Sequence, residues 1–189
     1  LRSRNWNFGV ILLCHGIELR IGQLADSSLI ARRLCPVQRI PVASPAYLQA
    51  HGRPLHPADL AKHQCLLYTN VSPPDVWRFA GPDGADYSVT VSGPLRANSG
   101  GALNPACLAG AGIALQPDFL VADLLEDGRL EPLLCDWRPA PLGLYLITPP
   151  SPLRPLRVRL LMDWLAERLR TPPWAWTPEK AARDRPAAP

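Results

Sequence analysis

Histidine and cysteine are the side chains in this sequence most able to hold a metal ion or to act as nucleophiles, and their spacing favours neither role. The four histidines stand alone, without the H-x-x-H or H-E-x-x-H spacing that places two imidazoles on one helix face around zinc. The five cysteines form no C-x-x-C pair, and their odd number argues against a disulfide framework. We therefore expect free, mostly buried thiols in a reducing compartment, with no metal, no cofactor and no catalytic residue. The positions are His15, His51, His56, His63, Cys14, Cys35, Cys65, Cys107 and Cys135.

The segment best suited to bind a small polar ligand begins with Asn98, Ser99 and Gly100. Asn and Ser are good caps for the first turn of a helix, because their side-chain oxygens accept hydrogen bonds from amides that have no partner within the helix. Gly100 and Gly101 would let a ligand approach the backbone. Since a helix N-terminus attracts anions, this segment is a candidate site for an anion or a polar group. An ordinary capped helix explains the same residues and is, from sequence alone, the more common case.

The residues around this segment indicate a strand, a loop, a short helix and a second strand. Val89 and Val91 alternate with polar residues, as in a half-buried strand. Small side chains from Ala102 to Ala109 favour a short helix, and Pro105 lies early in it, where a missing amide costs least. Ile113 to Leu115 form an apolar run between turn signals, which is typical of a buried parallel strand.

Two further candidate positions lie at predicted strand ends. Gln116 and Pro117 follow the apolar run, and ligands in open α/β sheets bind outside the carboxyl ends of the strands. The alternative for this pair is a turn into a helix that Asp118 caps. Ile21 and Gly22 also end a predicted strand, although the glycine can equally serve a tight turn.

The rest of the chain alternates strands with short helices. Ser44 and Pro45 begin one helix, because Ser caps well and Pro fits the first turn. Leucines and a tryptophan recur between Leu156 and Leu169 at helical spacing, which predicts an amphipathic helix on a sheet. The alternation predicts an α/β fold with largely parallel sheets. Beyond Thr171 we expect a disordered tail in which Trp174 and Trp176 are exposed by default, with docking on a neighbour as the alternative.

Length and charge limit the classes of function. A chain of 189 residues with 47% hydrophobic residues can form one domain, or two small lobes, with a real core. The net charge of +4 comes from 20 basic and 16 acidic residues, and the arginines are scattered, so we expect a solvated basic face rather than a nucleic-acid surface. The apolar run from Val10 to Cys14 is too short to cross a membrane. The chain does not begin with Met, and we expect it to be a fragment of a longer protein.

Several segments, in order along the chain, resemble the effector-binding domain of LysR-type transcriptional regulators. RANSGGAL at residues 96–103, followed by LAGAGIALQPDFLV at residues 108–121, is similar to the second subdomain of that domain. LADSSLIARRL at residues 24–34, ASPAYL at residues 43–48 and HPADLAKHQCLLY at residues 56–68 agree with the same family. The resemblance covers roughly residues 16–169.

This resemblance implies an α/β fold of two Rossmann-like lobes, similar to a type 2 periplasmic-binding-protein-like domain. Residues 1–69 and 150–170 would form the first lobe, residues 70–149 the second lobe, and residues 171–189 the disordered tail. The family's first strand and first helix are not recognisable near the N-terminus. We therefore expect an incomplete first lobe and an N-terminally truncated domain.

The resemblance also implies that a small polar or anionic organic effector binds between the two lobes and controls transcription. The implied partners are this effector and further copies in a homodimer or homotetramer, with DNA contacted through a missing N-terminal helix-turn-helix domain. The implied location is cytoplasmic, without a membrane contact. The implied effector-binding residues lie at strand ends and helix starts: Ile21, Gly22, Ser44, Asn98, Ser99, Gly100, Gln116 and Pro117.

Two other functions fit the same pattern. A solute-binding protein of a transporter has the same fold, and a signal peptide upstream of this sequence, rather than a helix-turn-helix, would indicate it. An enzyme on a related two-lobe fold is the second alternative, and turnover would be needed to support it, because no acid–base pair or nucleophile is legible.

Overall fold

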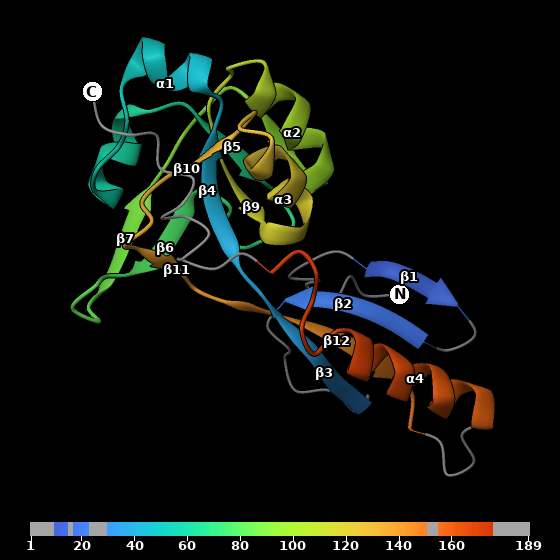
Figure 1. Ribbon diagram of the computed structural model, residues 1–189. Helices are drawn as coiled ribbons and strands as arrows, with labels where there is room; N and C mark the ends of the chain where they lie inside the picture. Colours follow the sequence, from blue (N-terminus) through green and yellow to red (C-terminus); the bar gives the residue numbers. More distant parts are fainter. Residues whose placement is uncertain (1–9, 15–16, 23–29, 151–154, 176–189) are drawn as a thin grey trace. The chain divides into compact units, whose positions relative to one another are not determined.

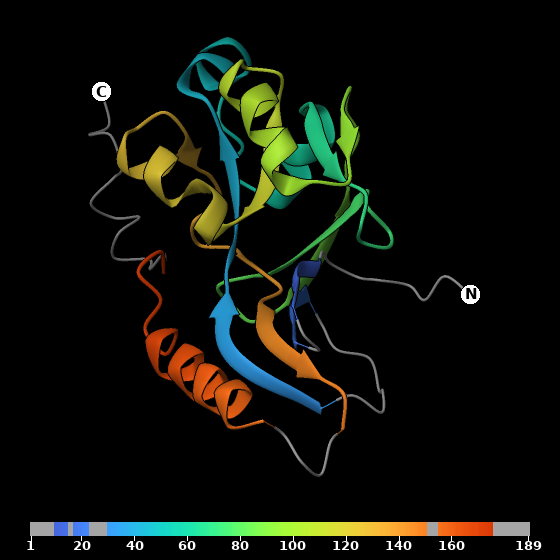
Figure 2. The same cartoon turned by 90° about the vertical axis from the view of Figure 1, so that its right-hand side faces the viewer.

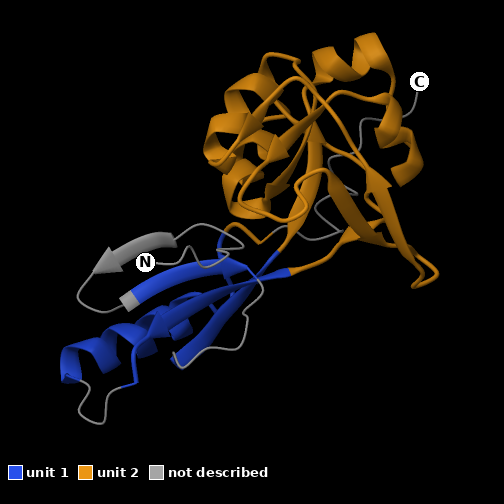
Figure 3. Cartoon of the chain, turned by 180° about the vertical axis from the view of Figure 1, so that it is seen from behind, with its two compact units in different colours: residues 1–37, 142–173 blue, residues 38–141, 174–189 orange. Residues whose placement is uncertain are grey.

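The computed structural model describes residues 10–14, 17–22, 30–150 and 155–175. The chain divides into two compact units, residues 1–37 with 142–173 and residues 38–141 with 174–189 (Figure 3). These crossings lie earlier along the chain than the predicted ones near residues 69 and 149. The reason is strand pairing: residues 39–43 and 65–68 both pair with the strand at residues 113–117, which places them in the second unit. The predicted incompleteness of the first lobe concerns residues that lie largely outside the described ranges.

Among the described residues, the first unit contains a four-stranded sheet in the order β1-β2-β12-β3 and one helix (Figure 1). All three strand pairings in it are antiparallel, so the predicted parallel arrangement is wrong for this sheet. β12 lies in the middle and is almost wholly buried. The elements are β1 (Val10–Cys14), β2 (Ile17–Gly22), β3 (Ile30–Val37), β12 (Leu142–Thr148) and α4 (Leu156–Arg168).

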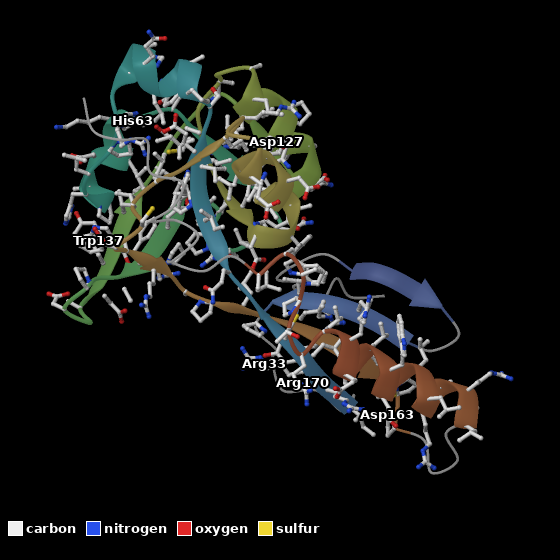
Figure 4. All side chains as sticks on the ribbon, in the orientation of Figure 1. Arg33, His63, Asp127, Trp137, Asp163 and Arg170 are labelled. Atoms are coloured by element: carbon white, nitrogen blue, oxygen red, sulfur yellow. The ribbon has the colours of Figure 1, made fainter. Side chains whose placement is uncertain are left out.

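Helix α4 confirms the predicted helix but buries less of its apolar surface than the pattern indicates. It contacts β3, and Asp163 (labelled in Figure 4) accepts a hydrogen bond from Arg32 of that strand, with 2.5 Å between the two atoms. Met162 is the buried residue of the helix, at 4% exposure. Leu156, Leu160 and Trp164, each at least 60% exposed, recur every four residues and form an apolar stripe on the outer face.

The second unit is built around a five-stranded sheet in the order β10-β4-β9-β5-β8. β9, β5 and β8 are parallel, whereas β4 and β10 are antiparallel to their neighbours, so the predicted parallel sheet is confirmed only for this part. The strands are β4 (Arg39–Ala43), β5 (Cys65–Tyr68), β8 (Arg96–Ala97), β9 (Ile113–Pro117) and β10 (Glu131–Pro132).

Apolar side chains cover this sheet on both faces, because successive strand residues point to opposite sides. Leu66 packs on one face with residues of α2 (Gly100–Leu108) and α3 (Asp118–Glu126), which lie beside each other (Figures 1 and 2). Cys65 and Leu67 point to the other face and pack on α1 (Pro45–His51) and η1 (Pro57–Lys62).

A small antiparallel sheet completes this second face of the unit. It has the order β11-β6-β7, with β6 (Val76–Ala80), β7 (Asp86–Thr90) and β11 (Arg138–Pro139). Trp77 and Phe79 of β6 are buried against the larger sheet. The α/β class predicted from the sequence is therefore confirmed.

The tail after α4 departs from its prediction at Trp174. Residues 171–175 are described, and Trp174 is partly buried and belongs to the second unit. Its ring lies edge-on to Phe119 of α3, with the ring centroids 6.3 Å apart. The prediction of disorder for residues 176–189 concerns residues outside the described ranges.

Candidate functional site

The carboxyl ends of the parallel strands in the second unit bring five of the predicted site residues to one edge of the sheet. β5 pairs in register with β8 and β9, so the three strands end at the same level. Asn98 and Ser99 follow β8, Gly100 begins α2, and Gln116 and Pro117 end β9. This edge is where ligands bind in open α/β sheets.

The N-terminus of α2 is free of a side-chain cap. Ser99 occupies the N-cap position with extended backbone angles (φ −124°, ψ 122°), but its hydroxyl makes no cap hydrogen bond. Ser99 and Asn98 are both exposed. The first turn contains no acidic residue, so the positive end of the helix is not neutralised from within. A ligand acceptor can therefore use the amides that the cap leaves unpaired.

Asn70 shapes the loop that leads into α2. Its side-chain nitrogen donates to the carbonyl of Asn98 at 2.9 Å and to the hydroxyl of Tyr68 at 3.3 Å. Both contacts tie the Asn98 loop to the end of β5. The sequence reasoning did not identify Asn70, although an amide side chain two residues after a buried strand is a usable signal.

Gln116 is buried and positions other residues of the edge. Its side chain is 1% exposed, and Nε2 donates to the carbonyl of Gly100 at 2.7 Å and to Oδ1 of Asn104 at 2.8 Å. Asn104 in turn donates to the carbonyl of Leu120 at 2.9 Å. Both amide hydrogens of Gln116 are therefore used within the protein, and the network joins β9, α2 and α3. Asn104 was also missed, because an Asn inside a helix is usually a solvent-facing residue.

Close packing explains why Gly100 begins the helix. A Cβ atom at this position would lie 2.8 Å from Cδ1 of Leu120 and 3.1 Å from Oε1 of Gln116. A larger residue would require the side chains of Leu120 and Gln116 to shift. Gly100 was predicted to let a ligand approach the backbone. Within the protein, the side chains of Leu120 and Gln116 approach it closely.

Pro117 and Asp118 form the turn from β9 into α3. Pro117 is the N-cap residue, and it provides no side-chain cap. Asp118 is 2% exposed, and its carboxylate accepts a hydrogen bond from the amide of Phe119 at 2.9 Å. The Asp118 amide donates to the carbonyl of Gln38 at 2.9 Å.

The structure does not bring Ser44 to this edge. β4 is antiparallel to β9, with Arg39 opposite Pro117 and Val42 opposite Ala114, so the residue after β4 lies at the other end of the sheet. Ser44 is 3% exposed, and its Oγ accepts the amide hydrogen of Tyr47 at 3.4 Å. It is the helix cap of α1, the alternative that the sequence also allowed.

Ile21 and Gly22 belong to the first unit. They end β2 and pair with Leu144 and Gly143 of β12. Both are buried, and Gly22 has a φ of +153°, which residues with a side chain rarely adopt. Ile21 and Gly22 therefore belong to a different unit from the other candidate residues.

Arg39 is a partly buried cation at the same level of the sheet as Pro117. Its Nη2 and Nε donate to the carbonyl of Ala140 at 3.0 Å and 3.3 Å. Burial lowers the pKa of the guanidinium to about 10. No carboxylate among the described residues forms an ion pair with it. Sequence reasoning missed Arg39, since one arginine at the start of a strand has no distinguishing pattern.

The histidines and cysteines discussed next contribute to the capping, hydrogen bonding and packing of the fold. His56 caps η1, and His63 Nδ1 lies 3.1 Å from the hydroxyl of Tyr47. Cys65 and Cys107 are buried free thiols, and burial raises their pKa values to about 12 and about 11. Within the described ranges, no group of three or more His, Cys, Asp and Glu residues is arranged to hold a metal ion. No helix in the same ranges is long and apolar enough to span a membrane.

The chain is similar to regulators of one family along most of its length. The family model described as "LysR substrate binding domain" matches residues 16–170. The HTH-type transcriptional regulator PtxR of Pseudomonas aeruginosa is 37% identical over 158 residues, which are 84% of this chain and 50% of that protein. CrgA of Neisseria meningitidis serogroup C, also an HTH-type transcriptional regulator, is 36% identical over 81% of this chain and 51% of that protein. The chain thus spans about half the length of the curated relatives it matches.

Solved structures of LysR-type regulators are also similar to this chain. The regulatory domain of CrgA, a LysR-type transcriptional regulator, has a TM-score of 0.71 at 35% identity, over 82% of this chain and 75% of that one. The full-length Vibrio cholerae virulence activator AphB has a TM-score of 0.71 at 34% identity, over 82% of this chain and 52% of that one.

Proposed function

Since the chain belongs to the LysR substrate-binding domain family, we propose that it is the effector-sensing domain of a LysR-type transcriptional regulator, and that its ligand is a small polar or anionic organic molecule. The observation that supports this ligand class is the uncapped N-terminus of α2, flanked by the exposed Asn98 and Ser99. Backbone amides at such an end bind carboxylates and similar groups. Gln116 and Asn70 hold the two sides of this end in place.

The wider role follows from the same family. Binding of the effector would favour one state of a homodimer or homotetramer, and a helix-turn-helix outside this chain would read the DNA. The protein would act in the cytoplasm and would not be an enzyme. The relatives reported above are named as transcriptional regulators, which favours this function over transport of a solute.

A ligand screen followed by one substitution tests the proposal. Organic acids and polar metabolites that raise the melting temperature of the chain would be taken to calorimetry. Replacing Ser99 with Trp should abolish or strongly weaken the binding of any confirmed ligand, because the bulky ring would cover the start of α2. Ser88→Trp is the matched control, since Ser88 is also exposed but lies on β7.

The two variants must show the same unfolding curve as the wild type for the comparison to count. Equal affinity of wild type and Ser99→Trp would remove the N-terminus of α2 from the site. Loss of binding in the control as well would show that the effect is not local.

A further inference from the structure

The outer face of α4 is apolar, where a surface helix is usually polar. Leu156, Leu160 and Trp164 are 67%, 60% and 60% exposed, and they recur every four residues. Residues at this spacing lie one above another on a helix, so the three side chains form one continuous row, called the α4 stripe below. Met162 is 4% exposed and lies on the opposite side of the helix, which contacts β3 of the sheet (Figures 1 and 2).

A continuous row of large apolar side chains on a surface indicates a contact with a partner. Single exposed leucines are common in folded proteins, and Leu55, which is 80% exposed, is of that kind. The α4 stripe differs because its members adjoin one another and because Leu161, 43% exposed, widens it. It also includes Trp164, and tryptophan is enriched among the residues that dominate binding energy at interfaces.

The charges beside the α4 stripe indicate what the partner is. The first half of the helix carries two exposed basic residues, Arg157 and Arg159. The second half carries the exposed acids Asp163 and Glu167 and one base, Arg168. A second copy of α4 in the antiparallel direction would set the positive half of each helix beside the negative half of the other. A parallel copy would instead set like charges together, and it would align the two helix dipoles unfavourably.

The charged groups needed for this pairing are available. Among the described residues, no carboxylate forms an ion pair with Arg157 or Arg159. Glu167 pairs with Arg170 at 2.9 Å, and both side chains are at least 70% exposed. Exposed pairs of this kind contribute little to stability, so Glu167 can exchange its partner at small cost. Asp163 keeps its hydrogen bond to β3 and is not needed.

We propose that α4 is a docking surface for a second copy of this chain. The two helices lie antiparallel about a twofold axis, with the stripes in contact and Arg157 of each copy beside Glu167 of the other. A twofold contact requires one patch that is complementary to itself, and the α4 stripe with its divided charges is such a patch. This contact goes beyond the proposed function, because it lies in the first unit and uses no residue of the candidate site.

The size of α4 predicts a weak pairing. The helix has 13 residues and is therefore about 20 Å long. Two such helices bury less than the roughly 1,200 Å² at which stable interfaces begin. We therefore expect a dissociation constant on the order of 100 µM, in the range of transient contacts.

Sedimentation equilibrium of the chain as it stands measures this association, between about 10 µM and about 1 mM. Leu160→Lys places a charge in the middle of the α4 stripe, and it should weaken the association at least about tenfold. Leu55→Lys is the matched control, since it also replaces an exposed leucine, but in the second unit. The control should associate as the wild type does.

A pair of charge reversals tests the antiparallel direction. Arg157→Glu and Glu167→Arg, each alone, would set like charges beside each other in both halves of the contact, so each variant should associate several-fold more weakly than wild type. An equal mixture of the two variants restores opposite charges at both places. The mixture should therefore associate about as well as wild type. This test alone decides the inference if Leu160→Lys does not fold.

Three results would overturn the inference: a wild type that stays monomeric over the whole range, equal association of wild type and Leu160→Lys, or a mixture that associates no better than its two variants separately. None of them bears on the Ser99 test, because effector binding is measured on residues of the second unit.

Discussion

The side-chain amide of Gln116 links the end of β9 to the first turns of α2, and its loss should be felt in stability. Gln116→Leu keeps the volume of the side chain but leaves the carbonyl of Gly100 and Oδ1 of Asn104 without their donor. We expect the free energy of unfolding in urea to fall by about 2 kcal/mol, since buried acceptors lose their hydrogen bonds. Gln49→Leu, at an exposed position of α1, is the control and should change it little. Equal effects of the two substitutions would contradict the positioning role.

Tyr47 and His63 make the second unit sensitive to acid. Burial, and next the charge of His51, lower the pKa of His63 from its ordinary 6.5, while Asp59 acts in the opposite direction. The neutral imidazole of His63 lies 3.1 Å from the Tyr47 hydroxyl, and this hydroxyl accepts the amide hydrogen of Gln64 at 3.0 Å. Because the unfolded chain binds the proton more tightly, His63 stabilises the fold fully above the unfolded pKa and less as the pH falls.

The direction of this pH dependence of stability can be tested with His63→Gln. The stability advantage of wild type over the variant should shrink between about pH 7.5 and about pH 5.5, as unfolding at each pH would measure. An advantage that stays constant or grows toward acid would show that His63 is not held neutral by its surroundings.

At the scale of elements, sequence patterns predicted where helices and strands begin but not how the strands pair. Ser44 and Pro45 begin α1, and Ser99 precedes α2, because caps and early prolines are local signals. The direction of β4 relative to β9 depends on residues more than 70 positions apart, as in the pair Arg39 and Pro117. An apolar strand looks the same in both directions, so the sequence could not show that Ser44 and Pro117 lie at opposite ends of the sheet.

The same limit explains why the sequence did not predict the contacts of Gln116 and Trp174. A Gln at the end of a strand fits a ligand contact and a buried link equally well, and the choice depends on Asn104, twelve residues away in sequence. Trp174 was expected to be exposed because its neighbours are prolines, and the contact with Phe119 is not visible in any local pattern.

Gly93 packs directly against the backbone at the start of β5, where there is no room for a side chain. A Cβ atom at this position would lie 2.0 Å from the carbonyl oxygen of Cys65 and 2.6 Å from its nitrogen, both rigid backbone atoms. We expect Gly93→Ala to lower the free energy of unfolding by about 3 kcal/mol or more, because the strand must move. Gly84→Ala in the β6–β7 hairpin is the control: its φ of +79° brings strain, about 1–2 kcal/mol, but no collision. A smaller loss at position 93 than at position 84 would disprove the steric argument.

Over the whole molecule, the two units differ in net charge. Residues 1–37 and 142–173 contain ten basic and four acidic residues, a net charge of +6, whereas the rest of the chain has ten and twelve, a net charge of −2. Several of these arginines already have acidic partners, such as Arg20 with Glu18 and Arg170 with Glu167. The charge is therefore spread and partly neutralised rather than gathered into a DNA-reading surface.

We accordingly expect this chain alone to bind DNA weakly and without sequence preference. A mobility shift at near-physiological salt should give the same faint binding to promoter DNA and to scrambled DNA, and it should disappear as salt is raised. A clear preference for the promoter would mean that this domain reads bases itself, and the proposed division of labour with a helix-turn-helix would be wrong.

The way the chain crosses between its units also sets an order of events during synthesis. The main part of the second unit, residues 38–141, is one continuous stretch, whereas the sheet of the first unit needs β12 and so waits for residues 142–148. On the ribosome the second unit can therefore fold while β2 and β3 remain without the strand that separates them. Residues 38–141 expressed alone should give a cooperative thermal transition, and a chain stopped at residue 141 should leave β2 and β3 open to proteolysis while the second unit resists it.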